Sequence, residues 1–268
     1  MDKDVINKTE FVKETVAKLK YFAQLYGINS LFLVGGYCRS TYFNDFSDLH
    51  DLDVASAYDR QAVEMAGLFA SEIVNSVPTI YERTQTAMVE YKSGDNAIRI
   101  EFQGKSPSPY MYNQEIRDWM HNQGIEDVPL MHNIYGRDFT INSLIYSLFN
   151  ENMYDLTERA VEDLDRGRIV SILPAAYLIK YNPLAALRAI RFSLRYEFSI
   201  DEELKDAIKN SYPFIAASLS EERVAKELVR ILTIDGERAI SVLKENNLDR
   251  LLLIPMVRQK AMEVNKDE

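Results

Sequence analysis

The alternation of hydrophobic and polar positions divides the chain into a mixed first part and a helical second part. Apolar residues recur at helical spacing over residues 8–26 and 60–76. Short apolar or alternating runs at residues 31–34, 52–56 and 79–103 predict strands. Because helix and strand share this stretch, it indicates an α/β or α+β domain.

The segments that follow have a different pattern. Residues 104–136 are polar and irregular, which predicts a loop with a short helix. From residue 137 onward nearly every position fits a helical period, and the predicted helices are 139–150, 184–196, 202–210, 221–233 and 236–247. We therefore expect an α+β chain, with a mixed-sheet domain over residues 1–150 and an all-helical part over residues 151–268.

Composition narrows the class further. The chain has 268 residues, of which 47% are hydrophobic and 27% charged, as in ordinary globular proteins. No apolar stretch reaches the roughly 18 residues that a membrane span needs, and the N-terminus lacks the apolar core of a signal peptide. Cys38 is the only cysteine, which excludes an internal disulfide and favours the cytoplasm.

The net charge of −10 argues against a long electrostatic track for RNA. The acidic excess lies in residues 1–179, whereas residues 180–268 hold equal numbers of acidic and basic side chains. A nucleic acid that binds this chain is therefore expected to contact a limited surface.

Two short features near the N-terminus carry candidate chemistry. The pair Gly35-Gly36 follows the predicted strand at 31–34, where a plain turn is the ordinary interpretation. Asp51 and Asp53 lie two residues apart on the next strand, so their carboxylates point to one face. Two such carboxylates repel each other unless a cation lies between them, and Mg²⁺ prefers oxygen ligands. A solvated edge strand is the alternative.

Two further groups of charges are ambiguous by themselves. Arg137 and Asp138 open the predicted helix 139–150, where an acid at the N-terminus with a partner arginine is common. Three arginines share one face of the helix 184–196, at positions 188, 191 and 195. Such a stripe is ordinarily a solvated face with salt bridges, but it also suits a triphosphate.

Taken together and in this order, the motifs resemble those of one family. They are GGxxR at 35–39, DxD at 51–53, RDFTIN at 137–142, NPLxxLRAxRF at 182–192 and LSxERVxxEL at 219–228. This order resembles the class II tRNA nucleotidyltransferases and bacterial poly(A) polymerases of the polymerase-β-like superfamily. The resemblance implies a nucleotidyltransferase head over residues 1–150, then a helical neck and the start of a body over residues 151–268.

The resemblance also implies roles for individual residues. Asp51 and Asp53 would be the catalytic carboxylates and the ligands of a two-metal Mg²⁺ site, with Glu101 as a candidate third ligand. A nucleoside triphosphate would be the substrate, and an RNA 3′ end the acceptor. The implied nucleotide-binding residues are Gly35, Gly36, Arg39, Arg137, Asp138, Asn142, Tyr181, Asn182, Arg188 and Arg191.

The sequence departs from the family pattern where the base would be read. Tyr181, Asn182 and Ala185 stand in place of a Glu-Asp pair and an arginine, so the choice of base is expected to be relaxed or redirected. Restoring Asp at 182 and Arg at 185 is expected to sharpen it. The family's body and tail domains have no counterpart here, and a homo-oligomer or a partner chain is one expected source of that acceptor platform.

Three functions are therefore open from the sequence. The first is a metal-dependent, template-independent ribonucleotidyltransferase that extends or repairs an RNA 3′ end, with tRNA as the leading acceptor. The second is the same chemistry in a poly(A)-type tailing enzyme or on a non-RNA acceptor. The third is a catalytically silent nucleotide-binding scaffold, which the altered base-reading residues favour and the retained Asp51 and Asp53 oppose.

Overall fold

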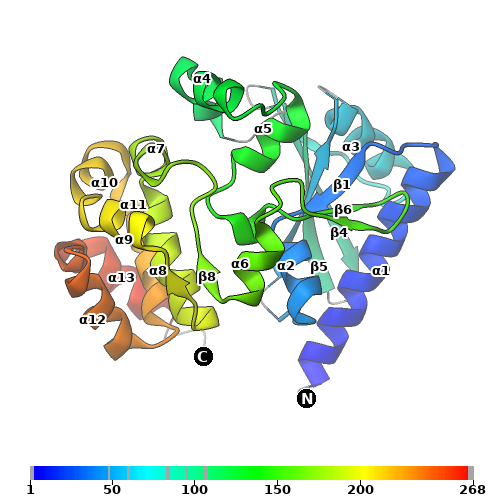
Figure 1. Cartoon of the computed structure of the whole chain (residues 1–268). Coiled ribbons are helices and arrows are strands. Elements are labelled where there is room, and N and C mark those ends of the chain that lie inside the picture. Colours follow the sequence, from blue (N-terminus) through cyan, green and yellow to red (C-terminus); the bar gives the residue numbers. More distant parts are fainter. Residues whose placement is uncertain are drawn as a thin grey trace. The chain divides into compact units, whose positions relative to one another are not determined.

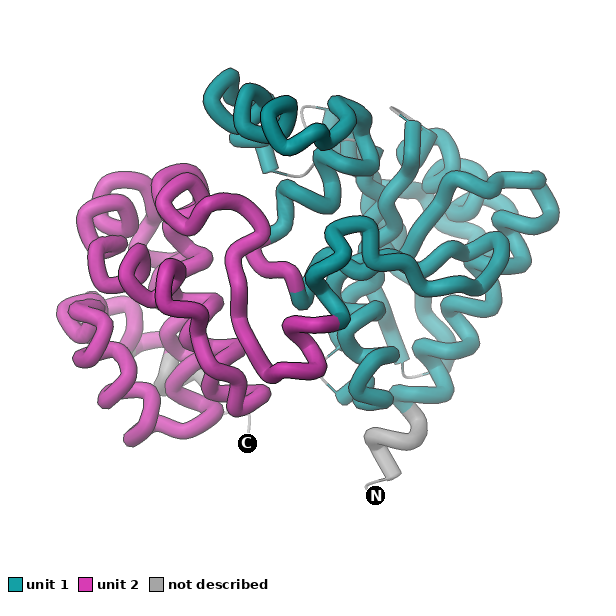
Figure 2. Tube along the Cα trace, in the orientation of Figure 1, with its two compact units in different colours: residues 1–137, 141–161 teal, residues 138–140, 162–268 magenta. Residues whose placement is uncertain are grey.

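The computed structural model describes residues 3–47, 49–58, 61–82, 85–94, 96–104 and 108–264. The chain forms two compact units (Figure 2). Unit 1 comprises residues 1–137 and 141–161, and unit 2 comprises residues 138–140 and 162–268. The domain boundary placed between residues 150 and 151 from sequence stays a prediction.

Unit 1 combines a sheet with helices (Figure 1). Its helices are α1 (Lys3–Leu25), α2 (Gly36–Phe43), α3 (Gln61–Glu72), α4 (Gln114–Asn122) and α5 (Pro129–Tyr135), with the 3₁₀ turn η1 (Pro109–Tyr112). Its strands are β1 (Leu31–Val34), β2 (Asp51–Ser56), β3 (Thr79–Tyr81), β4 (Thr86–Ser93), β5 (Asn96–Gln103), β6 (Ile145–Ser147) and β7 (Met153–Tyr154). The predicted strands at 31–34, 52–56 and within 79–103 are confirmed.

The seven strands form one mixed sheet in the order β3-β4-β5-β2-β1-β6-β7. Strands β2 and β5 run parallel, while the other neighbours are antiparallel. Because a parallel neighbour needs a crossover connection, the chain from β2 passes through α3, β3 and β4 before β5 completes the pair. This crossover places β2 in the interior of the sheet.

Strand β2 has one apolar and one polar face. Leu52 and Val54 are fully buried, and their register partners on β5 are Ile100 and Phe102. The Phe69 ring of α3 packs against Phe102 with a centroid distance of 5.9 Å, so α3 covers this apolar face. Since successive strand residues alternate between faces, the acidic residues of β2 must point to the opposite side.

The helix predicted at 139–150 is wrong. Residues 140–142 form a 3₁₀ turn, η2 (Thr140–Asn142), and β6 then pairs with β1, with Ile145 opposite Val34. The apolar spacing over these twelve residues fits either period, and the unpaired edge of β1 decides the outcome by offering backbone hydrogen bonds.

Unit 2 is helical apart from one pair of short parallel strands. Its helices are α6 (Ala160–Asp165), α7 (Ala175–Tyr181), α8 (Leu184–Tyr196), α9 (Glu202–Lys209), α10 (Tyr212–Ser218), α11 (Glu221–Leu232), α12 (Gly236–Glu245) and α13 (Pro255–Val264), with the 3₁₀ turn η3 (Asp249–Leu253). The strands are β8 (Arg168–Ile169) and β9 (Ser199–Ile200). The predicted α+β class, a mixed sheet followed by helices, is confirmed.

Side-chain caps mark the start of three helices of unit 2. The Ser220 side chain accepts a hydrogen bond from the backbone N–H of Arg223 at the start of α11. Asp201 and Asp235 cap α9 and α12 in the same way. The predicted bounds of these helices therefore lie close to the observed ones.

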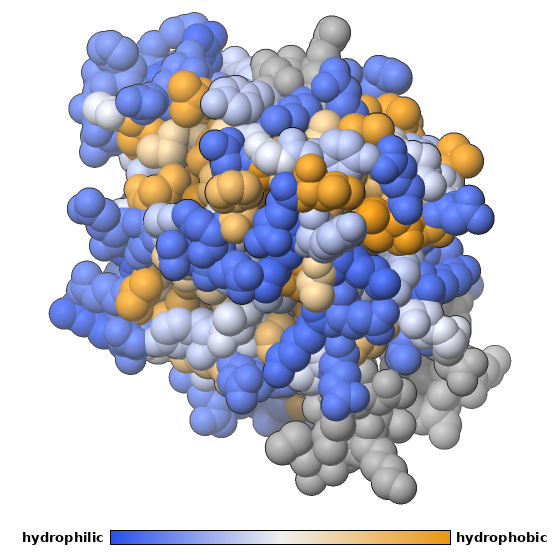
Figure 3. All heavy atoms as spheres, turned by 90° about the vertical axis from the view of Figure 1, so that its right-hand side faces the viewer, coloured by the Kyte–Doolittle hydropathy of each residue, from blue (hydrophilic) through white to orange (hydrophobic). Residues whose placement is uncertain are grey.

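One face of the surface mixes hydrophobic and hydrophilic residues. Figure 3 views the molecule from the right-hand side of Figure 1 and shows hydrophobic groups separated by hydrophilic residues. The most exposed apolar side chain in the described part of the chain is Val77, which precedes the edge strand β3. No helix in the described ranges is long and apolar enough to cross a membrane.

A buried carboxylate ties the segments of unit 2 together. Asp163 of α6 accepts hydrogen bonds from the Thr140 hydroxyl and from Nη2 of Arg168 on β8, both at 2.7 Å. Breaking a buried ion pair from one side leaves an uncompensated charge. Asp163 therefore contributes more to stability than its exposed neighbour Glu162, which pairs with Arg166.

We expect Asp163→Ala to lower the free energy of unfolding by about 3 kcal/mol, because Arg168 and Thr140 lose their 2.7 Å hydrogen bonds and keep only longer contacts with Glu162 and Val170. The adjacent Glu162→Ala, which removes an exposed pair, is expected to cost less than about 0.5 kcal/mol. Urea denaturation of both variants measures the difference. Equal losses would contradict the structural role given to Asp163.

Candidate active site

The polar face of β2 brings the two predicted metal ligands together. Asp51 is exposed and the Asp53 side chain is 27% exposed, and both point away from the apolar face that α3 covers. Asp53 is in register with Glu101 on the parallel strand β5. Residues in register on neighbouring strands share a face, so the candidate third ligand lies beside Asp53.

These residues alone do not enclose a metal ion. Within the ranges that the structure describes, no group of three His, Cys, Asp or Glu side chains is arranged to hold one. A magnesium site here would therefore use one or two carboxylates and take its remaining ligands from water and from substrate phosphates, which is the usual arrangement for Mg²⁺.

The glycine turn makes room for an arginine. Gly35 has φ 63° and ψ −116°, a conformation that favours glycine. A Cβ on Gly35 would lie 2.5 Å from Nη1 of Arg137 and 3.2 Å from Oδ2 of Asp53. On Gly36, it would lie 3.1 Å from the Leu49 side chain. The missing side chain of Gly35 thus lets Arg137 approach Asp53.

Helix α2 begins directly at this turn. Its N-terminal cap is Gly35, which has no side chain that could accept a hydrogen bond from the first N–H groups of the helix. The first backbone N–H groups of a helix have no partner within the helix, and the helix dipole adds positive charge at that end. The start of α2 is therefore suited to a phosphate beside Asp53 and Arg137.

Arg137 lies within a network of polar side chains. Its Nη1 is 3.9 Å from Oδ2 of Asp53, and its Nη2 donates to Oδ1 of Asn133 at 3.1 Å. Asn133 in turn donates to Oε1 of Gln103 at 2.9 Å, and Gln103 donates to Oδ1 of Asp53 at 3.3 Å. The four side chains form a closed ring at the centre of the candidate site.

Two further predicted residues of unit 1 meet each other. Nη1 of Arg39 on α2 donates a hydrogen bond to Oδ1 of Asn142 in η2. Asn142 is buried. The pair joins the glycine-turn motif to the RDFTIN motif, although the two residues are far apart in the sequence.

The remaining predicted residues belong to unit 2. Asp138 is buried and accepts hydrogen bonds from Nε of Arg188 at 2.5 Å and from the backbone N–H of Phe139 at 3.0 Å. Nε of Arg191 donates to the buried Glu227 on α11 at 2.6 Å. Within unit 2, Arg188 and Arg191 each have a carboxylate partner.

The base-reading positions lie where α7 ends and α8 begins. The Lys180 ammonium lies 4.8 Å from the centre of the Tyr181 ring, and Asn182 caps the C-terminus of α7. Ala185, in the first turn of α8, is 0% exposed. An arginine at 185 would therefore have to enter a fully buried position.

Residues 108–136 contain structure that the sequence did not indicate. The hydroxyls of Ser108 and Tyr110 both donate to the backbone carbonyl of Gly136, at 2.6 and 2.8 Å. Tyr112 packs edge-on against His132, and Trp119 against Tyr135. These contacts fix the residue before Arg137.

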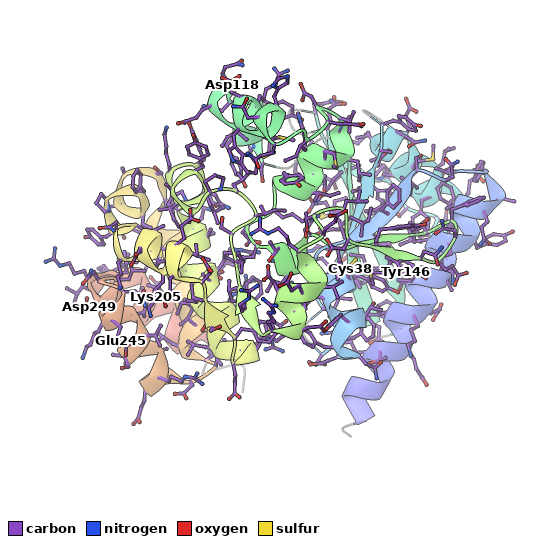
Figure 4. All side chains as sticks on the ribbon, in the orientation of Figure 1. Cys38, Asp118, Tyr146, Lys205, Glu245 and Asp249 are labelled. Atoms are coloured by element: carbon purple, nitrogen blue, oxygen red, sulfur yellow. The ribbon has the colours of Figure 1, made fainter. Side chains whose placement is uncertain are left out.

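A surface depression beside α4 lies apart from the predicted residues. Its lining residues are Gln114, Arg117, Asp118, Met120, His121, Gly124, Ile125, Glu126 and Asp127. The hydrogen bond from Arg117 lowers the pKa of Asp127, and the contact with His132 acts in the same direction. Asp118 lies on α4 (Figure 4). The depression contains none of the predicted site residues.

Cys38 has a structural position. Its thiol is buried on α2 and donates to the carbonyl of Leu33 at 3.2 Å. Burial raises the pKa of this thiol to about 12, so it stays neutral near pH 7. Figure 4 shows it together with Tyr146 of β6, whose pKa burial also raises.

Sequence reasoning missed Gln103 and Asn133. Both are buried amides without charge, and neither belongs to a motif. The available signals were weak: Gln103 follows Glu101 with the period of a strand, and Asn133 precedes Arg137 by one helical turn. Their contact depends on the parallel register of β2 and β5, which the sequence pattern alone does not give.

We expect Gly35→Ala to lower the free energy of unfolding by about 2–3 kcal/mol, since the conformation at φ 63° costs about 1–2 kcal/mol and the end of the Arg137 side chain must also shift. Gly94→Ala is the matched control, because Gly94 also has positive φ, +59°, but a Cβ there would meet no described atom within 4 Å. Gly94→Ala should therefore lose only the free energy that the backbone conformation costs. Chemical denaturation measures both, and equal losses would contradict the clash.

Curated relatives match parts of their own length. The tRNA nucleotidyltransferase cca2 of Schizosaccharomyces pombe is 29% identical over 133 residues, which cover 48% of this chain and 28% of that protein. The CCA-adding enzyme of Limosilactobacillus reuteri is 26% identical over 216 residues, 80% of this chain and 48% of that protein. The chain thus spans less than half the length of these relatives.

A solved structure has the same fold. The Thermotoga maritima CCA-adding enzyme, in complex with tRNA, aligns with a TM-score of 0.68 at 21% identity. The alignment covers 94% of this chain and 53% of that one. At this level of identity the similarity shows the fold alone.

A protein-family model matches the part of the chain that contains the candidate site. The model described as the poly A polymerase head domain matches residues 31–170, just over half of the chain. This range contains the glycine turn at 35–36, the carboxylates of β2 and the RDFTIN segment at 137–142. The chain therefore belongs to the poly A polymerase head-domain family.

Proposed function

We propose that this protein is a metal-dependent, template-independent ribonucleotidyltransferase that adds nucleotides to an RNA 3′ end, with tRNA as its acceptor. The observation that carries the proposal is the meeting of Asp53, Arg137 and Gly35 at the start of α2. This arrangement joins a carboxylate, a guanidinium and the N-terminus of a helix on the polar face of one sheet. Nucleotidyl transfer needs these three kinds of group.

Asp51 and Asp53 would hold Mg²⁺, with Glu101 as a third candidate ligand. Two carboxylates on one strand face fit a cation that takes its other ligands from water and phosphate. When bound, magnesium would lower the pKa of the acceptor 3′-hydroxyl and neutralise charge that develops at the α-phosphate.

The chain's own residues would position the nucleotide. The first backbone N–H groups of α2 would bind phosphate oxygens. Arg137 and Asp138 match the pair that reads the ribose in the family that the motifs resemble, so they would favour ribonucleotides. Arg39 is held by Asn142 at the base of the same turn. In the reaction, a bond forms between the 3′-oxygen and the α-phosphorus while the bond to pyrophosphate breaks. Correct placement supplies much of the rate enhancement.

Unit 2 would contribute to the choice of base. The proposed nucleotide-binding residues there are Asp138, Tyr181, Asn182, Arg188 and Arg191. Arg188 is oriented by Asp138 and Arg191 by Glu227, so each guanidinium has a fixed position within the unit. Asn182 and the ring of Tyr181 offer an amide and a stacking surface, but the two charged groups of the family pattern are absent.

The acceptor is proposed from the relatives. The curated proteins similar to this chain are named as tRNA nucleotidyltransferases and CCA-adding enzymes, and similar solved structures include complexes with CTP, ATP and tRNA. The chain covers about half of those structures.

Catalysis is tested on the two carboxylates. We expect the protein with Mg²⁺ to incorporate labelled ATP or CTP into tRNA that lacks part of its CCA end. Replacing both Asp51 and Asp53 by Asn should reduce the rate by at least about 10³-fold, since both charges that would bind the metal are lost. Asp118→Asn, on the exposed surface of α4, is the matched control and should retain the rate.

The acceptor range decides among the alternatives. Incorporation confined to truncated tRNA supports the proposal, whereas incorporation on an unrelated RNA would replace it with a tailing enzyme. If no RNA is extended, while nucleotide and Mg²⁺ still raise the melting temperature, the proposal fails in favour of a silent scaffold. Each of the four nucleotides is tested separately to identify the favoured base.

Whether residue 185 can hold a larger side chain is tested by measuring the stability of a variant. We expect Ala185→Arg to lower the free energy of unfolding by about 3 kcal/mol or more, because a charged side chain would enter a filled, buried position. Ala216→Arg, at an exposed position of α10, should change it by less than about 0.5 kcal/mol. If Ala185→Arg has wild-type stability, space for the family's base-reading arginine exists after all, and adding Asn182→Asp would then test base choice.

A further inference from the structure

The opposite charges of Asp53 and Arg137 approach each other without forming a hydrogen bond. The separation of Oδ2 and Nη1 is 3.9 Å. A charge-assisted hydrogen bond between such groups is about 2.7–2.9 Å long. The two atoms are therefore about 1 Å too far apart to form one. Something in the surrounding structure keeps them apart.

Two buried amide side chains form hydrogen bonds with these groups, one with the carboxylate and one with the guanidinium. Gln103, 5% exposed, donates through Nε2 to Oδ1 of Asp53 and to Oε1 of Glu101, each at 3.3 Å. Asn133, 2% exposed, accepts from Nη2 of Arg137 at 3.1 Å. The amides bond to each other at 2.9 Å. The carboxylate and the guanidinium are thus attached to opposite ends of one rigid spacer.

The direction of each amide in this spacer is determined by its neighbours. A carboxylate only accepts hydrogen bonds, so Gln103 must present its NH₂ group to Asp53 and Glu101. A guanidinium only donates, so Asn133 must present its oxygen to Arg137. The remaining group of Gln103, Oε1, accepts a hydrogen bond from the remaining group of Asn133, Nδ2. Flipping either amide would place two donors or two acceptors against each other.

Gly35 leaves the space between the charges open. The Cβ that it lacks would lie against both Nη1 of Arg137 and Oδ2 of Asp53. No side chain of Gly35 therefore separates the two groups, and the amides act from the far side. If the amides were absent, attraction would draw Arg137 onto Asp53.

We propose that Gln103 and Asn133 are positioning residues that hold Arg137 at this distance from Asp53, so that the guanidinium does not compete directly with a divalent cation for the carboxylate. The inference rests on the metal-dependent function proposed above. A directly bonded guanidinium would neutralise Asp53 and compete with the cation for its oxygens. The amides set this distance without adding a charge of their own.

The test uses Mn²⁺ alone as the probe, with binding to the whole chain followed by electron paramagnetic resonance. Asn133→Ala, and separately Gln103→Met, should each weaken Mn²⁺ binding by about tenfold or more, the usual effect of removing a partner that orients a metal ligand. Adding Arg137→Gln to either variant should restore the affinity, because the competing cation is then gone. Arg137→Gln alone should bind at least as tightly as the wild type.

Controls separate a lost spacer from a damaged fold. Asn150→Ala, in the turn between β6 and β7, makes the same chemical change outside the ring and should leave Mn²⁺ binding unchanged. Melting temperatures of all variants are recorded. A variant that is weak because it is unfolded would not recover when Arg137→Gln is added, and the second variant tests the other arm of the spacer independently.

The outcomes are distinct. Weakened binding that Arg137→Gln restores supports the inference. Wild-type affinity in both Asn133→Ala and Gln103→Met, or a loss that Arg137→Gln does not restore in either, overturns it while leaving the proposed function intact. If the wild type binds Mn²⁺ no better than the Asp51/Asp53 double variant, the metal assignment itself is wrong and the inference falls with it.

Discussion

The candidate site depends on one constraint, which is that β2 buries one face and leaves acidic side chains on the other. Leu52 and Val54 are packed beneath α3, so Asp51 and Asp53 have no alternative orientation. A shift of one residue in register would bury both carboxylates and expose the apolar pair. The hydrophobic core therefore determines where the charge lies, and the parallel neighbour β5 adds Glu101 and Gln103 to the same face.

Three arginines of unit 2 pair with buried carboxylates. Asp138 with Arg188, Glu227 with Arg191 and Asp163 with Arg168 each combine a buried carboxylate with an arginine. Such pairs contribute little net stability, since desolvation offsets their attraction, but they make the position of each guanidinium costly to change. The ring around Asp53 differs, because uncharged amides link its carboxylate to its arginine. Fixed geometry is obtained there without a direct hydrogen bond between the two charged groups.

Much of the fold followed from the sequence where burial and periodicity agree. The strand at 31–34 and the helix at 184–196 match the predicted bounds, because each has a strong apolar pattern and clear end signals. The helix predicted for residues 139–150 does not form, because the spacing of the apolar residues is ambiguous there and pairing with β1 decides the outcome. The charged residues of the site could be named from motifs and their order. The amides Gln103 and Asn133 could not, because their role arises only when β2, β5 and α5 come together.

The motif RDFTIN shows why a contiguous sequence need not act as one group. Arg137 belongs to unit 1 and is held by Asn133 beside Asp53, whereas Asp138 belongs to unit 2 and is held by Arg188. The two residues lie in a bend between α5 and η2, where consecutive side chains need not share a direction, so they can serve different surroundings. A substitution of Arg137 should therefore change the environment of Asp53, and a substitution of Asp138 that of Arg188. Motif resemblance treats the two as a pair, but their physical partners are separate.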